Sequence, residues 1–160
     1  MSPPSRWHRI PPEVRAAAAI EAGERLLGWA GDPPLVATSW GLWMPGEQRL
    51  DWDDIDHVGW SPPTLAVLPS GGLPARTARL TEPGDLPDLV RAEVDLSLVF
   101  SRRESLRPLP GGVRLVGRRS PRSGDLRWEV LFEGSADAAD PEVSGRAREL
   151  LRLAQQELAG

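Results

Sequence analysis

Four residue types are missing from the 160-residue sequence: cysteine, lysine, asparagine and tyrosine. Without cysteine the chain can form no disulfide and no thiolate metal site, and without asparagine it has no N-glycosylation sequon. A nucleotide-binding P-loop is also excluded, because that motif needs a lysine. The absence of cysteine fits a reducing compartment, so we expect a cytoplasmic protein.

Long apolar runs are missing as well. The run from Ala16 to Ile20 has only five residues between Arg15 and Glu21, which is too short for a signal peptide or a membrane span. The net charge of -4 disfavours duplex nucleic acid as a partner, so none is expected. The 16 glycines and 17 prolines are spread between apolar segments and indicate many turns.

The first half of the chain indicates short strands. Residues 1–11 are rich in proline and predict a flexible N-terminal arm, and Pro12 with the alanine-rich stretch to Ala22 predicts a short helix. Beyond Gly23, apolar segments alternate with turn residues, which is typical of hairpins. The predicted strands are residues 25–30, 35–38, 42–44, 48–52, 55–60 and 64–68.

The clearest period-two pattern lies in the second half. Apolar residues occupy every second position from Val90 to Phe100, which predicts a strand with one buried face. The same alternation between Leu126 and Phe132 predicts another strand, and residues 113–118 predict a third between them. We expect these three strands to pair antiparallel.

The C-terminal segment 140–158 is predicted to be a helix. Asp140 is a favourable N-cap and Pro141 a favourable first residue. Apolar residues at helical spacing form one stripe: Val143, Ala147, Leu150, Leu151, Ala154 and Leu158. We expect the stripe to pack on strand residues such as Leu96, Leu98 and Val130, within a single α+β domain of residues 12–160.

Several segments carry a resemblance to a known superfamily. They are Gly23-Glu24-Arg25-Leu26-Leu27, the apolar strand that ends at Thr38 before the bend Ser39-Trp40-Gly41, and the aromatic-acid-isoleucine step in Leu50–Ile55. With the C-terminal helix, they resemble the PH-like superfamily, especially its bacterial PH and GRAM-type branches. Over residues 23–158 the resemblance implies an antiparallel β-barrel or split barrel of about seven to nine strands with a capping helix. The basic pair of a phosphoinositide-binding PH domain is replaced by Gly31-Asp32-Pro33-Pro34, so no lipid ligand is implied.

An acidic cluster is the first candidate site. Carboxylates with a histidine could hold a hard divalent cation, and the cluster comprises Asp51, Asp53, Asp54, Asp56 and His57. It lacks the glycine and the closing glutamate of a calcium loop, so we interpret it as solvated acids around a turn and expect no metal and no cofactor. No Gly-x-Ser-x-Gly elbow occurs, and no enzymatic activity is expected.

Two further features indicate binding. The turn-rich hairpin 118–125 is flanked by three arginines, Arg118, Arg119 and Arg122. Their guanidinium groups and the backbone N–H groups of the turn could bind a phosphate. Alternatively, these arginines face water and pair with acids on the neighbouring strand. Trp40 lies at a predicted bend, where an exposed aromatic ring would suit a partner surface.

We therefore predict a PH-like, non-enzymatic binding or scaffolding module with a protein partner. Binding of anionic lipid or another phosphate ligand by the hairpin is the alternative, and an Asp-dependent metal enzyme is a remote one.

Overall fold

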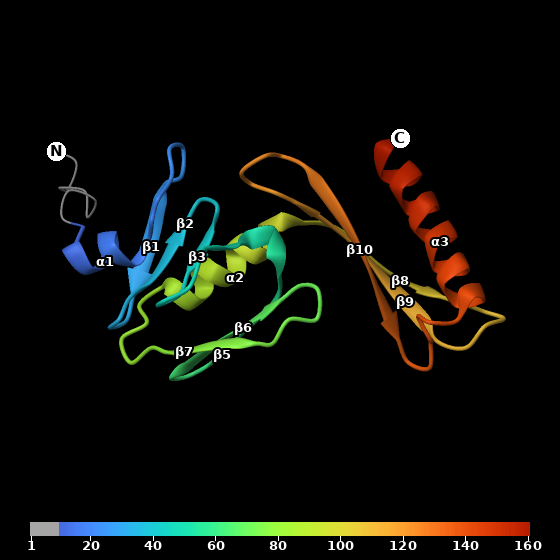
Figure 1. Cartoon of the computed structure of the whole chain (residues 1–160), viewed down its shortest axis with the longest axis horizontal. Coiled ribbons are helices and arrows are strands. Elements are labelled where there is room, and N and C mark those ends of the chain that lie inside the picture. The colour runs from blue at the N-terminus through green and yellow to red at the C-terminus, as the bar shows by residue number, and fades with distance from the viewer. Residues whose placement is uncertain (1–9) are drawn as a thin grey trace. The chain divides into compact units, whose positions relative to one another are not determined.

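The computed structural model describes residues 10–160, which form two compact units (Figure 1). The first unit comprises residues 10–97 together with the turn at 120–124, and the second comprises residues 98–119 and 125–160. Each unit has its own hydrophobic core.

The first unit contains two antiparallel sheets, with the strand orders β1-β2-β3-β4 and β5-β6-β7. Every strand pairs with the strand that follows it in its sheet, as the frequent turn residues predicted. The elements in chain order are α1 (Pro12–Ala17), β1 (Leu26–Ala30), β2 (Leu35–Thr38), β3 (Gly41–Trp43), β4 (Leu50–Asp51), η2 (Trp52–Asp54), β5 (Ile55–Ser61), β6 (Thr64–Pro69), β7 (Arg76–Arg79) and α2 (Leu86–Ser97).

Helix α2 occupies residues 90–97 of the predicted strand 90–100, so the prediction was wrong there, whereas residues 98–100 are in a strand. Leu86, Val90 and Val94 are spaced by four residues, and all three are buried on one helix face. Leu96, which a strand would have placed on the same face as Val94, is instead 73% exposed. Val90 and Val94 fit both periods, and the helix buries them together with Leu86 against the core of the first unit.

The core of the first unit lies between its sheets and α2. Trp52 is 1% exposed, and its indole N–H donates to the Thr38 carbonyl at 2.9 Å, so the largest core side chain has its polar atom satisfied. The other buried members that α2 and the strands contribute include Leu35, Leu42, Ile55, Leu65, Val67 and Val90.

The second unit is a three-stranded antiparallel sheet with one helix. Strand β9 (Gly112–Arg119) lies between β8 (Leu98–Ser105) and β10 (Leu126–Glu133), and α3 (Pro141–Ala159) follows. Asp140 caps α3 by accepting the Glu142 amide at 2.9 Å, as the sequence predicted. The predicted stripe is buried at Val143, Ala147, Leu150 and Ala154, which pack with strand residues such as Val113, Leu115 and Val130.

The α+β class with antiparallel sheets is confirmed, but the described residues form three open sheets and no closed barrel. The largest buried cluster of each unit is separate from that of the other. Helix α2 fills the first core, and α3 covers β8, β9 and β10. Leu96 and Leu98 were therefore wrongly assigned as packing partners of α3, and both are exposed.

Smaller differences concern the ends of elements. Helix α1 stops at Ala17 rather than Ala22, and β7 was not predicted. Most of the predicted N-terminal arm, residues 1–9, lies outside the described residues. Within residues 10–160, no helix combines the length and the apolar character needed to cross a bilayer.

Candidate functional site

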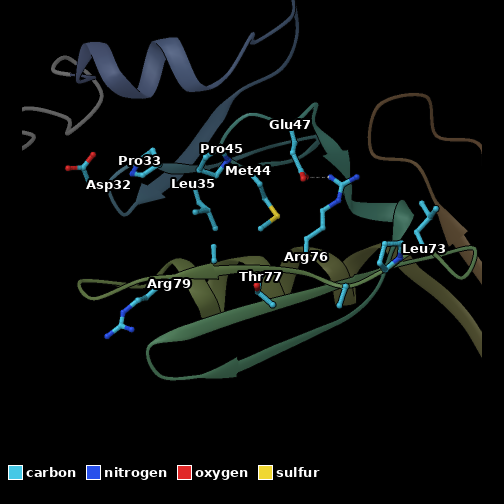
Figure 2. A pocket seen from close by; sticks show the side chains of 13 residues that line it. Asp32, Pro33, Leu35, Met44, Pro45, Glu47, Leu73, Arg76, Thr77 and Arg79 are labelled. Atoms are coloured by element: carbon cyan, nitrogen blue, oxygen red, sulfur yellow. Dashed lines mark ion pairs between the residues drawn. The ribbon is translucent and has the colours of Figure 1, made fainter.

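A groove with a volume of about 690 Å³ runs between the two sheets of the first unit (Figure 2). One wall is formed by the β1–β2 turn, β2 and the β3–β4 turn, and the other by β7 and the loop before it. We call it the β7 groove, and its lining residues are Asp32, Pro33, Leu35, Met44, Pro45, Glu47 and residues 73–79. Its volume falls within the range of ligand pockets in proteins, about 300–1,000 Å³.

The floor of the β7 groove is apolar. Leu35 and Met44 point from the first sheet toward β7 (Figure 2), and both side chains are buried in the core behind the groove. Ala78 packs against the same core from β7. Leu73 lies in the loop before β7 and is 55% exposed, so apolar surface continues onto the rim of the groove.

Charged residues lie at two places along the β7 groove. Arg76 on β7 forms an ion pair with Glu47 of the opposite wall at 2.7 Å, and this pair connects the two walls (Figure 2). Figure 2 shows Arg79 and Asp32 at the end of the groove farther from Leu73, one on each wall. The end at Arg79 is therefore the one without an ion pair between the lining residues.

Within residues 10–160, strand β7 pairs only with β6, so it is the edge strand of its sheet there. The Leu80 amide donates to the Pro63 carbonyl at 2.7 Å, one position beyond the β6–β7 register. Since backbone groups alternate in direction along an antiparallel strand, Ala78 also bonds toward β6, and Thr77 and Arg79 direct their N–H and C=O groups to the open edge. Side chains from both faces of β7 line the groove, so this open edge borders it.

A second feature of the first unit is a network of charges around the buried side chains of Arg49 and Glu24. The Arg49 guanidinium carbon lies 5.3 Å from the centroid of the Trp40 ring and 5.7 Å from that of Trp43. The same guanidinium is bonded to three carboxylates within 2.9 Å, those of Glu21, Glu24 and Asp51. The Arg49 side chain is 9% exposed, and stacking on the aromatic rings stabilises its charge away from water.

The Glu24 carboxylate is fully buried at the centre of this network. Burial raises its pKa, but the hydrogen bond from the Thr38 hydroxyl, the bonds from the Glu21 amide and the Trp43 indole, and the charge of Arg49 outweigh burial and lower the pKa overall. Burial lowers the pKa of Arg49, yet its carboxylate partners raise it overall. Both groups are therefore charged at neutral pH.

The network explains two of the segments that carried the resemblance. Thr38 accepts hydrogen bonds from the Trp40 and Gly41 amides at 3.2 Å and donates to Glu24, so it holds the β2–β3 turn on the network. Glu24 lies in the segment that leads into β1, and its carboxylate accepts the hydrogen bond from the Thr38 hydroxyl. These residues therefore have a structural role in the first sheet.

No family model, curated protein or solved structure matches this chain. The assignment of a function therefore depends on the residues and on the geometry of their surroundings. The predicted sites can be compared with that geometry one by one.

The three arginines of the predicted phosphate-binding hairpin do not form one exposed cluster. Arg118 is 5% exposed, whereas Arg119 and Arg122 are exposed. The Arg122 guanidinium lies 5.1 Å from the centroid of the Trp40 ring and 3.5 Å from the Glu21 carboxylate. The Ser120 hydroxyl also accepts the Arg122 and Ser123 amides at 3.2 Å, so these N–H groups already have an acceptor.

Trp40 lies at the predicted bend and is partly exposed. Because Arg49 and Arg122 both lie against its ring, part of the surface expected for a partner is covered by this chain's own side chains. In the acidic cluster, Asp51 binds Arg49 at 2.6 Å and Asp53 is buried in η2. Over the described range 10–160, no three His, Asp or Glu side chains are grouped so that they could hold a metal ion.

The sequence analysis did not detect the β7 groove. Its second wall is the short run 73–79, which contains Pro74 and two arginines and has little apolar periodicity. The groove also depends on residues 32–47 of the first sheet, which lie about 25 to 45 positions earlier in the chain. The Ser70-Gly71-Gly72 turn after β6 was the available signal that another strand could follow it.

Proposed function

We propose that this chain is a non-enzymatic binding module that takes an extended segment of a partner protein as an added strand on β7. The observation that supports this function is the open edge of β7 beside a groove with an apolar floor. Edge strands with unpaired N–H and C=O groups are templates for another strand. In such complexes the main-chain hydrogen bonds supply affinity, and pockets for alternate side chains supply specificity.

The dimensions of the site suit an extended segment. Strand β7 spans Arg76–Arg79, and the groove continues along the preceding loop to Leu73, so about five to seven residues of a partner have backbone or side-chain contacts available. A compact ligand would leave the edge of β7 unused. An extended polypeptide uses both the edge and the apolar floor.

The alternative of an anionic lipid or another phosphate ligand at residues 118–125 has less support. Arg118 is buried, and Arg122 lies against Trp40 and Glu21. A phosphate would have to compete with the Glu21 carboxylate for Arg122. We therefore propose protein binding at β7 ahead of phosphate binding at the hairpin.

We also propose that the PH-like part of the chain lies within its first unit, from residue 23 to residue 97. The support is the number and order of its elements, because seven strands in two antiparallel sheets are followed by one helix, α2. On this proposal α2, and not the C-terminal helix, takes the position of the capping helix that the resemblance implies. An experimental structure with another connectivity of β1–β7 and α2 would contradict it.

The strand-addition proposal can be tested with two variants at one position. Thr77→Pro removes an N–H group at the open edge and leaves the β6–β7 hydrogen bonds in place, because proline is tolerated on edge strands. Thr77→Val is the matched control, since it keeps the N–H group and favours extended backbone. Heptapeptides are selected from a random displayed library against the full chain, and their dissociation constants are measured by fluorescence polarisation.

We expect the selected heptapeptides to bind the wild type and Thr77→Val alike, and Thr77→Pro about tenfold more weakly, as the loss of one hydrogen bond predicts. Circular dichroism checks that all three proteins have the same fold. A library that yields no binder, or binders that do not distinguish Thr77→Pro from Thr77→Val, would contradict the proposal.

A further inference from the structure

We infer that the segment bound at β7 carries a single acidic side chain beside Arg79, next in sequence to an apolar side chain that lies on the groove floor. This inference rests on the proposed function and specifies the chemistry of the partner. It follows from the alternation of β7, from the charges around the groove, and from the composition of β7 itself.

The alternation of β7 gives the added strand two different faces. Arg76 and Ala78 are half-buried and Thr77 and Arg79 are exposed, so the strand has an inner and an outer face. A strand that pairs with β7 continues this alternation across the sheet. Its residue beside Ala78 then faces the apolar floor, and the neighbouring residue beside Arg79 faces outward.

The two arginines of β7 differ in whether a carboxylate of this chain forms an ion pair with them. Arg76 is paired with Glu47 at 2.7 Å, so its charge is already balanced within the groove. Arg79 is exposed, and its guanidinium has no ion pair or hydrogen bond with any residue of 10–160. An acidic side chain directly across from Arg79 would supply the opposite charge that favourable cross-strand pairs contain.

The opposite wall limits how many acids the segment can carry. Asp32 lines the same groove, at the end where Arg79 lies (Figure 2). A run of acidic residues would bring like charges toward the Asp32 carboxylate, which is unfavourable at short range. One acid beside Arg79, with apolar or neutral neighbours, is the pattern that pairs with Arg79 and avoids repulsion by Asp32.

A second copy of this chain does not match this pattern. Strand β7 reads Arg76-Thr77-Ala78-Arg79 and contains no acid, so pairing between the β7 strands of two copies leaves Arg79 without an opposite charge. The occupant that the charges favour is therefore a segment of a different polypeptide.

The test repeats the selection from the random heptapeptide library with the wild type, Arg79→Gln and Arg79→Glu. We expect the wild-type pool to be enriched in peptides with one Asp or Glu next to an apolar residue, and the Arg79→Glu pool to be enriched in Lys or Arg there. Individual acidic peptides should bind Arg79→Gln up to about fivefold more weakly than the wild type, and Arg79→Glu more weakly still. The difference should shrink in 0.5 M salt, because exposed charges are screened. Arg148→Glu, which makes the same change of charge on α3, is the control and should bind like the wild type.

The outcomes separate the inference from the proposed function. Selected peptides whose binding is weakened by Thr77→Pro, but which show no enrichment in acidic residues, overturn the inference and leave the strand-addition proposal intact. Enrichment in basic residues has the same consequence. A failure to select any peptide overturns both. Sedimentation of the chain alone provides the last outcome, since a dimer that Thr77→Pro dissociates would identify a second copy as the occupant and overturn the inference.

Discussion

Replacing Glu24 by glutamine changes one charge at the centre of the Arg49 network and leaves the size of the side chain almost unchanged. One carboxylate oxygen accepts the Thr38 hydroxyl and the Trp43 indole N–H, and the other accepts the Glu21 amide and the Arg49 guanidinium. All four partners act as donors. Glutamine offers an acceptor oxygen to only one of the two pairs, so its NH₂ group faces donors in either orientation.

The size of the effect follows from the groups left without an acceptor. With the NH₂ group toward Thr38 and Trp43, the Thr38 hydroxyl can turn to the Gly41 carbonyl at 3.3 Å, but the Trp43 indole N–H loses its acceptor. An unsatisfied buried donor costs about 1–3 kcal/mol, and the remaining bond to Arg49 loses its ionic partner. We expect Glu24→Gln to lower the free energy of unfolding by about 2–4 kcal/mol at pH 7.

The pH dependence of this effect has a defined sign. The pKa of Glu24 is lower in the folded chain than in the unfolded chain, so ionised Glu24 stabilises the fold fully above the unfolded-state pKa of about 4.3. This stabilisation is lost as the pH falls through the folded-state pKa. Glutamine does not titrate, so the difference between wild type and variant should narrow as the pH falls below about 4.3.

Urea unfolding of both proteins at pH 7 and at several acidic values measures the difference. Glu82→Gln, which changes an exposed glutamate in the loop before α2, is the matched control and should leave the unfolding curve unchanged. A difference below about 1 kcal/mol at pH 7, or one that stays constant into acid, would refute the reasoning.

Three other substitutions test the packing of the two units by urea unfolding. Leu115→Ala, at the fully buried centre of β9, should lower the free energy of unfolding by about 2–5 kcal/mol, whereas Leu153→Ala on the exposed side of α3 should lower it by less than about 1 kcal/mol. Leu96→Ser should change it by less than about 0.5 kcal/mol, because this side chain is 73% exposed on α2; a loss above about 2 kcal/mol would favour the strand that the alternation predicted. Asp140→Ala should cost about 0.5–2 kcal/mol, since it removes the oxygen that accepts the Glu142 amide.

The sequence by itself determined the local elements whose signals do not depend on distant partners. The hairpin β1–β2 follows from two apolar runs around Gly31-Asp32-Pro33-Pro34, and the observed β2 has the predicted bounds, Leu35–Thr38. Helix α3 follows from Asp140, Pro141 and an apolar stripe at helical spacing. Turn chemistry and capping act within a few residues, so they can be recognised before the fold is known.

Only the tertiary structure decided the form of residues 86–97. Val90 and Val94 satisfy a period of two as well as a helical period, and a single segment has no means of choosing between them. The choice depends on which face meets a core, and here the helix buries Leu86, Val90 and Val94 together. That choice also gives the core of the first unit a helix of its own, so α3 packs in a separate core with the strands of the second unit.

The candidate site depends on tertiary structure for the same reason. The β7 groove brings the turns near Asp32 and Glu47 beside residues 73–79, and the Arg49 network joins Glu24 to a partner 25 positions away. The sequence identified Trp40 and Arg122 as unusual, but it could not show that the two side chains lie against each other. Contacts between distant segments depend on how the whole chain folds, and therefore no local pattern of residues encodes them.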